Sequence, residues 1–315
     1  MRRMLKKTGA LLLCLSLLAA LSAGTAAAEY TEYSEEDDLE TYTEEEPADE
    51  GYPEDEEYPE DEGKTAPEEE TGAAAEKAPV TRSAETQALL EEFTLTHGDR
   101  NSPKVAITVD DCWANSTKHL NRIIDLCEQY KIPVTFFALD LQGCLHPKHR
   151  EMWQRALDAG CEIGCHYYNH IFMGSRDNWT IIDRLGKWQE DLDNTLGYHY
   201  QTRWLRPPFG NIEDQHISKR STQRMTKVIK IFGFDHIVRW DVSETVADKA
   251  VTKVENGCIM LFHGKNKDVK CLETLIPWLL ENGYQPVTVS ELFGYDPPET
   301  SAELYVYNKA DYEGK

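Results

Sequence analysis

Two acidic residues and two histidines in this sequence have the types and spacing of a metal site. Asp110 and Asp111 follow the apolar run 107–109, and His166 and His170 lie four residues apart after a second apolar run. One carboxylate and two imidazoles suit a divalent, zinc-like ion and leave positions open for water and substrate. A lone H-x-x-x-H pattern also occurs in core-capping histidines, and the neighbouring acids favour the metal interpretation.

The same positions carry groups that can move a proton. Adjacent side chains at a strand end point to opposite sides, so one of Asp110 and Asp111 can bind the metal while the other acts as a base. The run before them is of the buried type, so both acids border a core, where pKa values shift readily. His263 follows the run 259–262 and has the placement of a general acid. A hydrogen-bonded core histidine is the alternative for this residue.

The chain from Lys104 onward alternates short β-type runs with amphipathic helical runs, which predicts parallel strands joined by helices. The predicted strands are 105–109, 133–138, 161–165, 203–205, 236–240, 259–262 and 286–289. The predicted helices are 118–130, 150–159, 180–196, 221–232 and 272–281, with a further helix at 84–93. Seven such strands suffice for a barrel, and periodicity leaves an open doubly wound sheet as the alternative.

The polar residues fall at the carboxyl ends of these predicted strands. Arg206 follows the fourth strand, and Trp240 and Asp241 end the fifth, in the same relation that the acids and histidines have to theirs. In a parallel barrel all these ends share one mouth, where catalytic groups collect. The repeated placement favours a seven-stranded α/β barrel with one active site.

The charge distribution argues against a nucleic-acid partner and defines a linker. The formal net charge is −23, and residues 29–80, with 23 acidic residues and two lysines, contribute −21 of it. Residues 1–28 add +4, so residues 81–315 carry −6 and have no basic surplus for a phosphate backbone. The stretch 29–80 cannot bury enough apolar surface to order itself, and we predict a disordered acidic linker.

Residues 1–28 have the pattern of a signal peptide: a basic start, an apolar run over 10–23 and small residues before Glu29. The apolar run is shorter than the roughly 20 residues of a spanning helix, which disfavours a transmembrane anchor. We therefore predict cleavage before Glu29, a secreted or cell-wall-associated protein, and no transmembrane segment afterwards. Seven cysteines remain in the mature chain, an odd number in apolar segments, so we expect buried thiols rather than a disulfide framework.

Four segments resemble, in order and spacing, the motifs of the polysaccharide deacetylases with a NodB homology domain, also called carbohydrate esterase family 4. Residues 108–111 resemble the motif T-F-D-D-G, and residues 162–170 resemble the histidine motif. Residues 206–210 resemble R-x-P-Y, and residues 261–264 resemble L-x-H. The resemblance covers about 103–292. It implies a distorted parallel (β/α) barrel of NodB type. We divide the chain after the linker into a connecting segment with a short helix (81–102), the catalytic domain (103–293) and an acidic C-terminal tail (294–315).

The resemblance also implies roles for the site residues. Asp110 would be the catalytic base, oriented by Arg206, and His263 would be the general acid. The metal ligands would be Asp111, His166 and His170. Phe209 and Leu261 would contact the substrate, Phe209 as an aromatic wall whose main-chain N–H helps to stabilise the oxyanion.

The fourth family motif, D-x-x-D-W, is not recognisable in this chain. In its place, Asp241 or Glu244 would be the charge partner of Arg206 or His263, and Trp240 would face the substrate. Two further departures concern the metal site: Cys112 stands where the family has glycine, and Tyr167 stands where it has serine or threonine.

The function implied is an exported, metal-dependent deacetylase that removes N- or O-acetyl groups from a glycan such as peptidoglycan, chitin or xylan. Zinc would be the ion, with cobalt or manganese as alternatives, and the protein would act as a monomer on an acetylated polysaccharide. The departures from the motifs leave a second hypothesis, a carbohydrate-binding relative without turnover. A metallophosphoesterase is disfavoured, because ligands for a second metal are not evident.

Overall fold

The computed structural model describes residues 83–212 and 219–314. The predicted signal peptide, 1–28, and the predicted acidic linker, 29–80, lie outside these described residues. The first element is α1 (Ala84–Phe93), which begins where the Ser83 hydroxyl accepts a hydrogen bond from the Thr86 N–H at 3.2 Å. A serine at this position satisfies one of the free N–H groups of the first helical turn.

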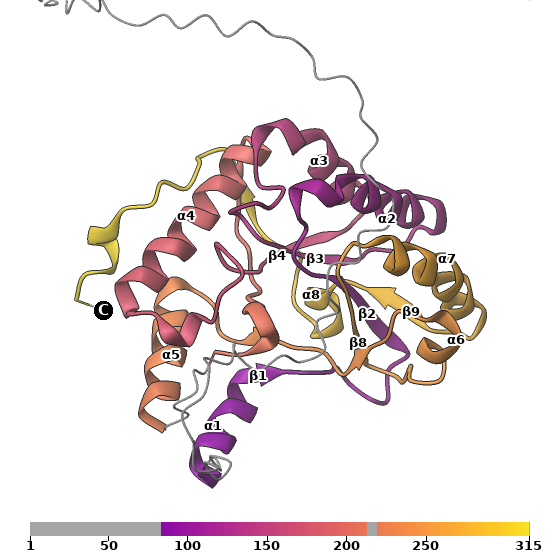
Figure 1. Cartoon of the computed structure of the whole chain (residues 1–315), viewed down its shortest axis with the longest axis horizontal. Coiled ribbons are helices and arrows are strands. Elements are labelled where there is room, and N and C mark those ends of the chain that lie inside the picture. Colours follow the sequence, from indigo (N-terminus) through magenta and orange to yellow (C-terminus); the bar gives the residue numbers. More distant parts are fainter. Residues whose placement is uncertain (1–82, 213–218, 315) are drawn as a thin grey trace, which may run out of the picture. The chain divides into compact units, whose positions relative to one another are not determined.

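A parallel sheet forms the centre of the fold (Figure 1). Its strands are β2 (Lys104–Val109), β3 (Thr135–Ala138), β4 (Glu162–Cys165), β7 (Val242–Ser243) and β8 (Ile259–Phe262). The order is β4-β3-β2-β8-β7, and β9 (Gln285–Val287) pairs with the first half of β2, where Lys104 aligns with Gln285. Nearly every residue of β2, β3, β4 and β8 is buried, as expected for parallel strands covered on both faces.

The sheet curves on beyond β4 into a distorted barrel. Leu205 forms parallel bridges with Cys165 of β4 on one side and with Ile237 of β6 (Ile237–Val238) on the other. β6 in turn pairs in parallel with β1 (Thr94–Leu95). In the described residues the ladder does not run unbroken around the ring, and the predicted strand 203–205 is reduced to the single bridging residue Leu205. The predicted distorted α/β barrel is confirmed.

The long helices form a ring outside the strands (Figure 1). They are α2 (Thr117–Tyr130), α3 (Arg150–Asp158), α4 (Asn178–Leu196), α5 (Lys219–Phe232) and α7 (Asn266–Glu281), with the short helices α6 (Ala247–Ala250) and α8 (Val289–Leu292). Neighbours in this ring contact one another in the order α7, α2, α3, α4 and α5. One strand prediction is too long at its end: 286–289 was expected as strand, but Thr288 accepts from the Glu291 N–H and begins α8 at Val289.

Residues after α8 lie against α4. β10 (Thr300–Ser301) pairs antiparallel with β5 (His199–Tyr200), and the Tyr305 N–H donates to Asp193 Oδ2 of α4 at 2.8 Å. The ring of Tyr307 lies directly over Gly186, where any Cβ would overlap it. Among the described residues, no helix is both long enough and apolar enough to cross a bilayer.

Asp140 lies just after β3 and connects the sheet to the helix ring. Its carboxyl group contacts that of Asp191 on α4, and burial followed by this neighbour raises the pKa of Asp140 to about 8. The ordinary pKa of an aspartate is about 3.9, so between about pH 4 and pH 8 the folded chain holds a proton that the unfolded chain has lost. The free energy of unfolding must therefore fall as the pH rises through this window.

Replacing Asp140 with asparagine should remove this dependence, because the amide does not titrate. From pH 5 to pH 8, we expect the free energy of unfolding of the unsubstituted chain to fall by about 1–2 kcal/mol more than that of Asp140→Asn. Urea unfolding at both pH values measures the difference, with the exposed Asp248→Asn as the control that keeps the dependence. Equal pH dependence in all three proteins would contradict the interpretation.

Candidate active site

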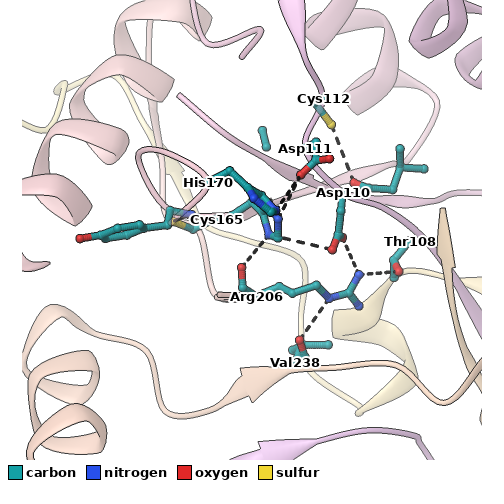
Figure 2. A network of polar contacts seen from close by, with 12 residues as sticks. Thr108, Asp110, Asp111, Cys112, Cys165, His170, Arg206 and Val238 are labelled. Carbon is teal, nitrogen blue, oxygen red and sulfur yellow. Dashed lines mark hydrogen bonds and ion pairs between the residues drawn. The ribbon is translucent and has the colours of Figure 1, made fainter. Parts of the chain in front are cut away.

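The carboxyl end of β2 sends its two aspartates in different directions. The Asp110 N–H still donates to the Phe262 carbonyl of β8 at 2.8 Å, so Asp110 continues the ladder. Asp111 and Cys112 then take φ values of 65° and 52°, which turn the chain sharply out of the strand. Figure 2 shows the resulting arrangement, with Asp110 facing Arg206 and Asp111 facing the histidines.

Arg206 is completely buried and holds Asp110 in place. Its Nη1 donates to Asp110 Oδ1 at 2.6 Å and to Thr108 Oγ1 at 2.7 Å, and its Nε donates to the Val238 carbonyl at 3.1 Å. The guanidinium carbon lies 4.1 Å from the ring centroid of Phe137. Burial lowers the pKa of Arg206, and the charge of Asp110 opposes that shift. A charge this deep in the barrel is retained because every direction of its planar group has a partner.

Arg206 also fixes the orientation of His166. The main-chain carbonyl of Arg206 lies 2.7 Å from His166 Nδ1 and accepts a hydrogen bond from it. With Nδ1 carrying the proton, the lone pair of Nε2 is free, and Nε2 lies 3.3 Å from Asp111 Oδ1. An acceptor bonded through one ring nitrogen is the usual way in which a metal-binding histidine is oriented.

Asp111, His166 and His170 come together in a group that could hold a metal ion, and we call this group the metal-binding cluster. Asp111 Oδ1 lies 3.6 Å from His170 Nε2, and one ligand atom from each of the three residues lies within 4.8 Å of the others. Burial opposes ionisation of Asp111, but the neighbouring His166 and the charges of His170 and His263 outweigh it and lower its pKa. Asp111 is therefore a carboxylate, ready to bind a cation.

The donor set fits a divalent metal. Asp111 Oδ1 is buried and has no hydrogen-bond donor among the described residues, although two imidazole nitrogens face it. A carboxylate oxygen and the Nε2 lone pair of His166 repel each other unless a proton or a metal ion lies between them. One carboxylate and two imidazoles, with the fourth side open, are a ligand set of catalytic zinc sites.

His263 lies at the end of β8, and Asp268 fixes its main chain. Asp268 Oδ2 accepts from the N–H of His263 at 3.0 Å and from that of Lys265 at 2.9 Å, in the first turn of α7. The His263 ring is near enough for its charge to lower the pKa of Asp111. The structure thus brings His263 to the metal-binding cluster.

An exposed pair of aromatic rings borders the same cluster. Phe209 is 41% exposed and meets the His170 ring edge-on, with 4.5 Å between centroids. Phe172 is 43% exposed and stacks on Phe209 at 4.3 Å and 25°. The sequence predicted Phe209 as a substrate contact but did not predict Phe172. The one sequence feature that could have indicated Phe172 is its position two residues after His170.

The remaining predicted site residues divide into two groups. Trp240 lies beside the site, with its ring centroid 5.6 Å from the Arg206 guanidinium carbon, and the almost fully buried Leu261 aligns with Thr108 across the β2–β8 pair. Asp241 does not pair with Arg206. It binds Arg100 Nη2 at 2.5 Å and accepts from the Ile259 N–H at 2.7 Å.

Glu244, the other candidate for the missing fourth motif, forms hydrogen bonds with the main chain of its own loop. It accepts from the N–H groups of Thr245 and Val246 and pairs with Lys253 at 3.0 Å. The partner of Arg206 is thus Asp110 itself. The sequence did not predict the role of Trp113, whose Nε1 donates to Asp111 Oδ2 at 3.1 Å and orients this carboxylate.

Left-handed backbone conformations gather around the site. Six non-glycine residues of the described chain have positive φ, and four of them are Asp111, Cys112, Tyr167 and Phe209. Such conformations each cost of order 1–3 kcal/mol and persist where surrounding contacts impose them, typically at functional sites. Cys112 and Tyr167, the two departures from the family motifs, are both fully buried at these strained positions.

Comparison with known proteins shows which family and which fold the chain resembles. The sequence model of polysaccharide deacetylases matches residues 97–228. Uncharacterized protein YlxY of Bacillus subtilis is 25% identical over 205 residues, which are 64% of this chain and 61% of that protein. A peptidoglycan-N-acetylglucosamine deacetylase of Bacillus cereus is 27% identical over 217 residues, 62% of this chain and 90% of that protein.

Solved structures show the same fold. A family 4 carbohydrate esterase pseudoenzyme from Bacillus anthracis aligns with a TM-score of 0.52 at 23% identity, over 64% of this chain and 69% of that one. The chain spans less than two thirds of YlxY, its first curated relative. The family match agrees with the motifs at the strand ends and with the distorted barrel that positions them. Residues 97–228 are therefore similar to the polysaccharide deacetylase family, and the chain shares the fold of carbohydrate esterase family 4 structures.

Proposed function

We propose that this protein is an exported, metal-dependent deacetylase that hydrolyses N- or O-acetyl groups on a polysaccharide. The observation that carries the proposal is one juxtaposition. A carboxylate and two histidines suited to zinc lie directly beside Asp110, a second carboxylate that Arg206 holds in a fixed orientation. Metal-assisted hydrolysis needs these two units next to each other.

The residues divide the chemical work as follows. A divalent ion held by Asp111, His166 and His170 would polarise the acetyl carbonyl and make a water molecule more acidic. Arg206 engages Asp110 through Oδ1 and leaves Oδ2, 4.0 Å from His166 Nδ1, to accept the proton of the attacking water. His263 would donate a proton to the departing amine or alcohol, and the Phe209 N–H would stabilise charge on the acetyl oxygen.

The substrate class follows from the family and from the aromatic border of the site. Exposed rings such as Phe209 and Phe172 pack against the apolar faces of sugar rings, as aromatic side chains do at polar interfaces. Peptidoglycan is the substrate named for the Bacillus cereus relative, and chitin-like glycans and acetylated xylan are the other members of the proposed class. We propose that the chain acts on them as a monomer after export, outside the cell or in its wall.

A second candidate function is carbohydrate binding without turnover. The observation that favours it is the replacement of two motif residues by Cys112 and Tyr167, together with a fold shared with a protein described as a pseudoenzyme. The complete set of Asp110, Asp111, His166, His170 and His263 favours hydrolysis instead.

Acetate release from acetylated glycans tests the proposed hydrolysis. With zinc, cobalt or manganese added, we expect release from at least one of chitooligosaccharide, peptidoglycan and acetylxylan. Asp110→Asn and His263→Ala should each lower kcat by about 10²–10⁴-fold, because each removes one proton transfer. The exposed His97→Ala serves as the control with unchanged activity. Metal and sugar binding without acetate release from any glycan would favour the second candidate.

Zinc titration of the metal-free protein tests the ligand set. We expect one ion per chain, and His166→Gln should weaken zinc binding by about 100-fold or more, whereas the exposed His146→Gln should not. Burial opposes the charged form of His166, but Asp110 and Asp111 outweigh it and raise its pKa. Zinc must displace that proton, so affinity should fall as the pH drops through the raised pKa. Calorimetry at several pH values measures both effects, and unchanged affinity in His166→Gln would refute the assignment.

The stacked pair of phenylalanines predicts a binding effect without a chemical one. Phe172→Ala should raise KM about tenfold and leave kcat within about twofold, because stacking on a sugar ring is equal in the ground and transition states. Leu280→Ala, which removes an equally exposed apolar side chain at the end of α7, is the control. Steady-state kinetics on the preferred glycan distinguish the two parameters. A fall in kcat alone would place Phe172 in the chemical step.

A further inference from the structure

A second pocket lies at the opposite end of the barrel from the metal-binding cluster. Its volume is about 220 Å³. Its lining residues 201–204 precede Leu205, and Gly233, Asp235 and His236 precede β6, whereas Arg206 and Trp240 follow these strand segments. The pocket therefore opens at the amino ends of the two segments. Its walls include Arg203, Trp204, His236 and Tyr295.

Arg203 is held in this pocket without an acceptor. Its guanidinium carbon lies 5.0 Å from the ring centroid of Tyr295, and Tyr295 meets Trp204 edge-on at 5.2 Å. The Nε of Arg203 is buried and has no hydrogen-bond partner among the described residues. A guanidinium fixed against an aromatic ring, with its donors unused, is set up to bind an oxyanion.

His236 contributes a second unused nitrogen to the same pocket. Its ring packs beside Phe93, with 6.2 Å between centroids, and Nδ1 is buried without a hydrogen-bond partner in the described chain. Native structures pair nearly all buried polar atoms, so an unpaired one calls for an explanation such as a ligand. Arg203 and His236 both line this pocket, from segments more than 30 residues apart, and each carries one such nitrogen.

The other residues that line the pocket indicate which further groups the ligand carries. Asp235 and Glu299 also line the pocket and are exposed at its edge, so they would accept hydrogen bonds from hydroxyl or ammonium groups. An apolar cavity of about 150 Å³ holds benzene, so a cavity of 220 Å³ holds a molecule of roughly ten heavy atoms. The occupant therefore combines a carboxylate with neighbouring hydrogen-bond donors on a small frame.

We propose that this pocket binds a small carboxylate that carries hydroxyl or ammonium groups, with Arg203 and His236 as the oxyanion ligands. A sugar acid and an amino acid share this chemistry. The site is separate from the metal-binding cluster and does not depend on the deacetylase proposal.

Calorimetric titration of the full chain with glucuronate, alanine and neutral glucose tests the proposal and distinguishes the two sources. We expect glucuronate or alanine to bind in about the millimolar range or tighter, and glucose not to bind. Arg203→Gln should weaken this binding at least about tenfold, since a charged donor pair is lost. Asp110→Asn should leave it unchanged, which separates the pocket from the proposed active site.

Arg203→Lys keeps the charge but loses the planar fork, and His236→Asn removes the second donor. Both should weaken binding, and thermal unfolding of each variant verifies that it folds, so the test does not depend on Arg203→Gln alone. Absence of binding by both acids would overturn the proposal. Equal affinity for glucose and glucuronate, or unchanged affinity in folded Arg203 variants, would overturn it as well.

Discussion

The ion pair between Arg206 and Asp110 is the interaction on which the rest of the site depends. Arg206 has no exposed surface, and it joins the ends of three strand segments, through Asp110 and Thr108 of β2, the Val238 carbonyl of β6 and the His166 imidazole after β4. Such a buried charge pair contributes little net stability, and loss of either partner leaves an isolated charge in the core. Its value here is geometric, because the Arg206 side chain orients Asp110, the proposed base, and the Arg206 carbonyl orients His166, a proposed metal ligand.

The strained backbone around this pair has the same purpose. Asp111 and Cys112 leave β2 in left-handed conformations, and this turn separates the directions of two adjacent aspartates. Trp113 and the histidines then fix the Asp111 carboxylate. Packing in the core offsets the cost of these left-handed conformations, since Cys112 has no exposed surface and lies in the main hydrophobic core. A small buried thiol thus occupies a position where the related motif has glycine.

Sequence patterns predict the elements that repeat and miss those set by distant contacts. The strand ends with Asp110, His166, Arg206 and His263 are predictable, since a parallel barrel gathers such ends at one mouth. The partner of Asp241 is not, because Arg100 is 141 residues away and no local pattern links the two. β7 is too short for periodicity to reveal, and the strand predicted at 203–205 is reduced to the bridge at Leu205. Phe172 and Trp113 become recognisable only when the fold places them beside His170 and Asp111.

The central claim is that Asp111, His166 and His170 bind one metal ion beside the Asp110 carboxylate. A crystal structure of the zinc-loaded protein, with diffraction measured on both sides of the zinc absorption edge, tests it most directly. The account predicts one anomalous peak within about 2.0–2.2 Å of Asp111 Oδ1 and of the Nε2 atoms of His166 and His170. It also predicts that Arg206 still binds Asp110, with Asp110 outside the coordination shell. Zinc bound elsewhere, or coordinated by Asp110 in place of Asp111, would contradict the account.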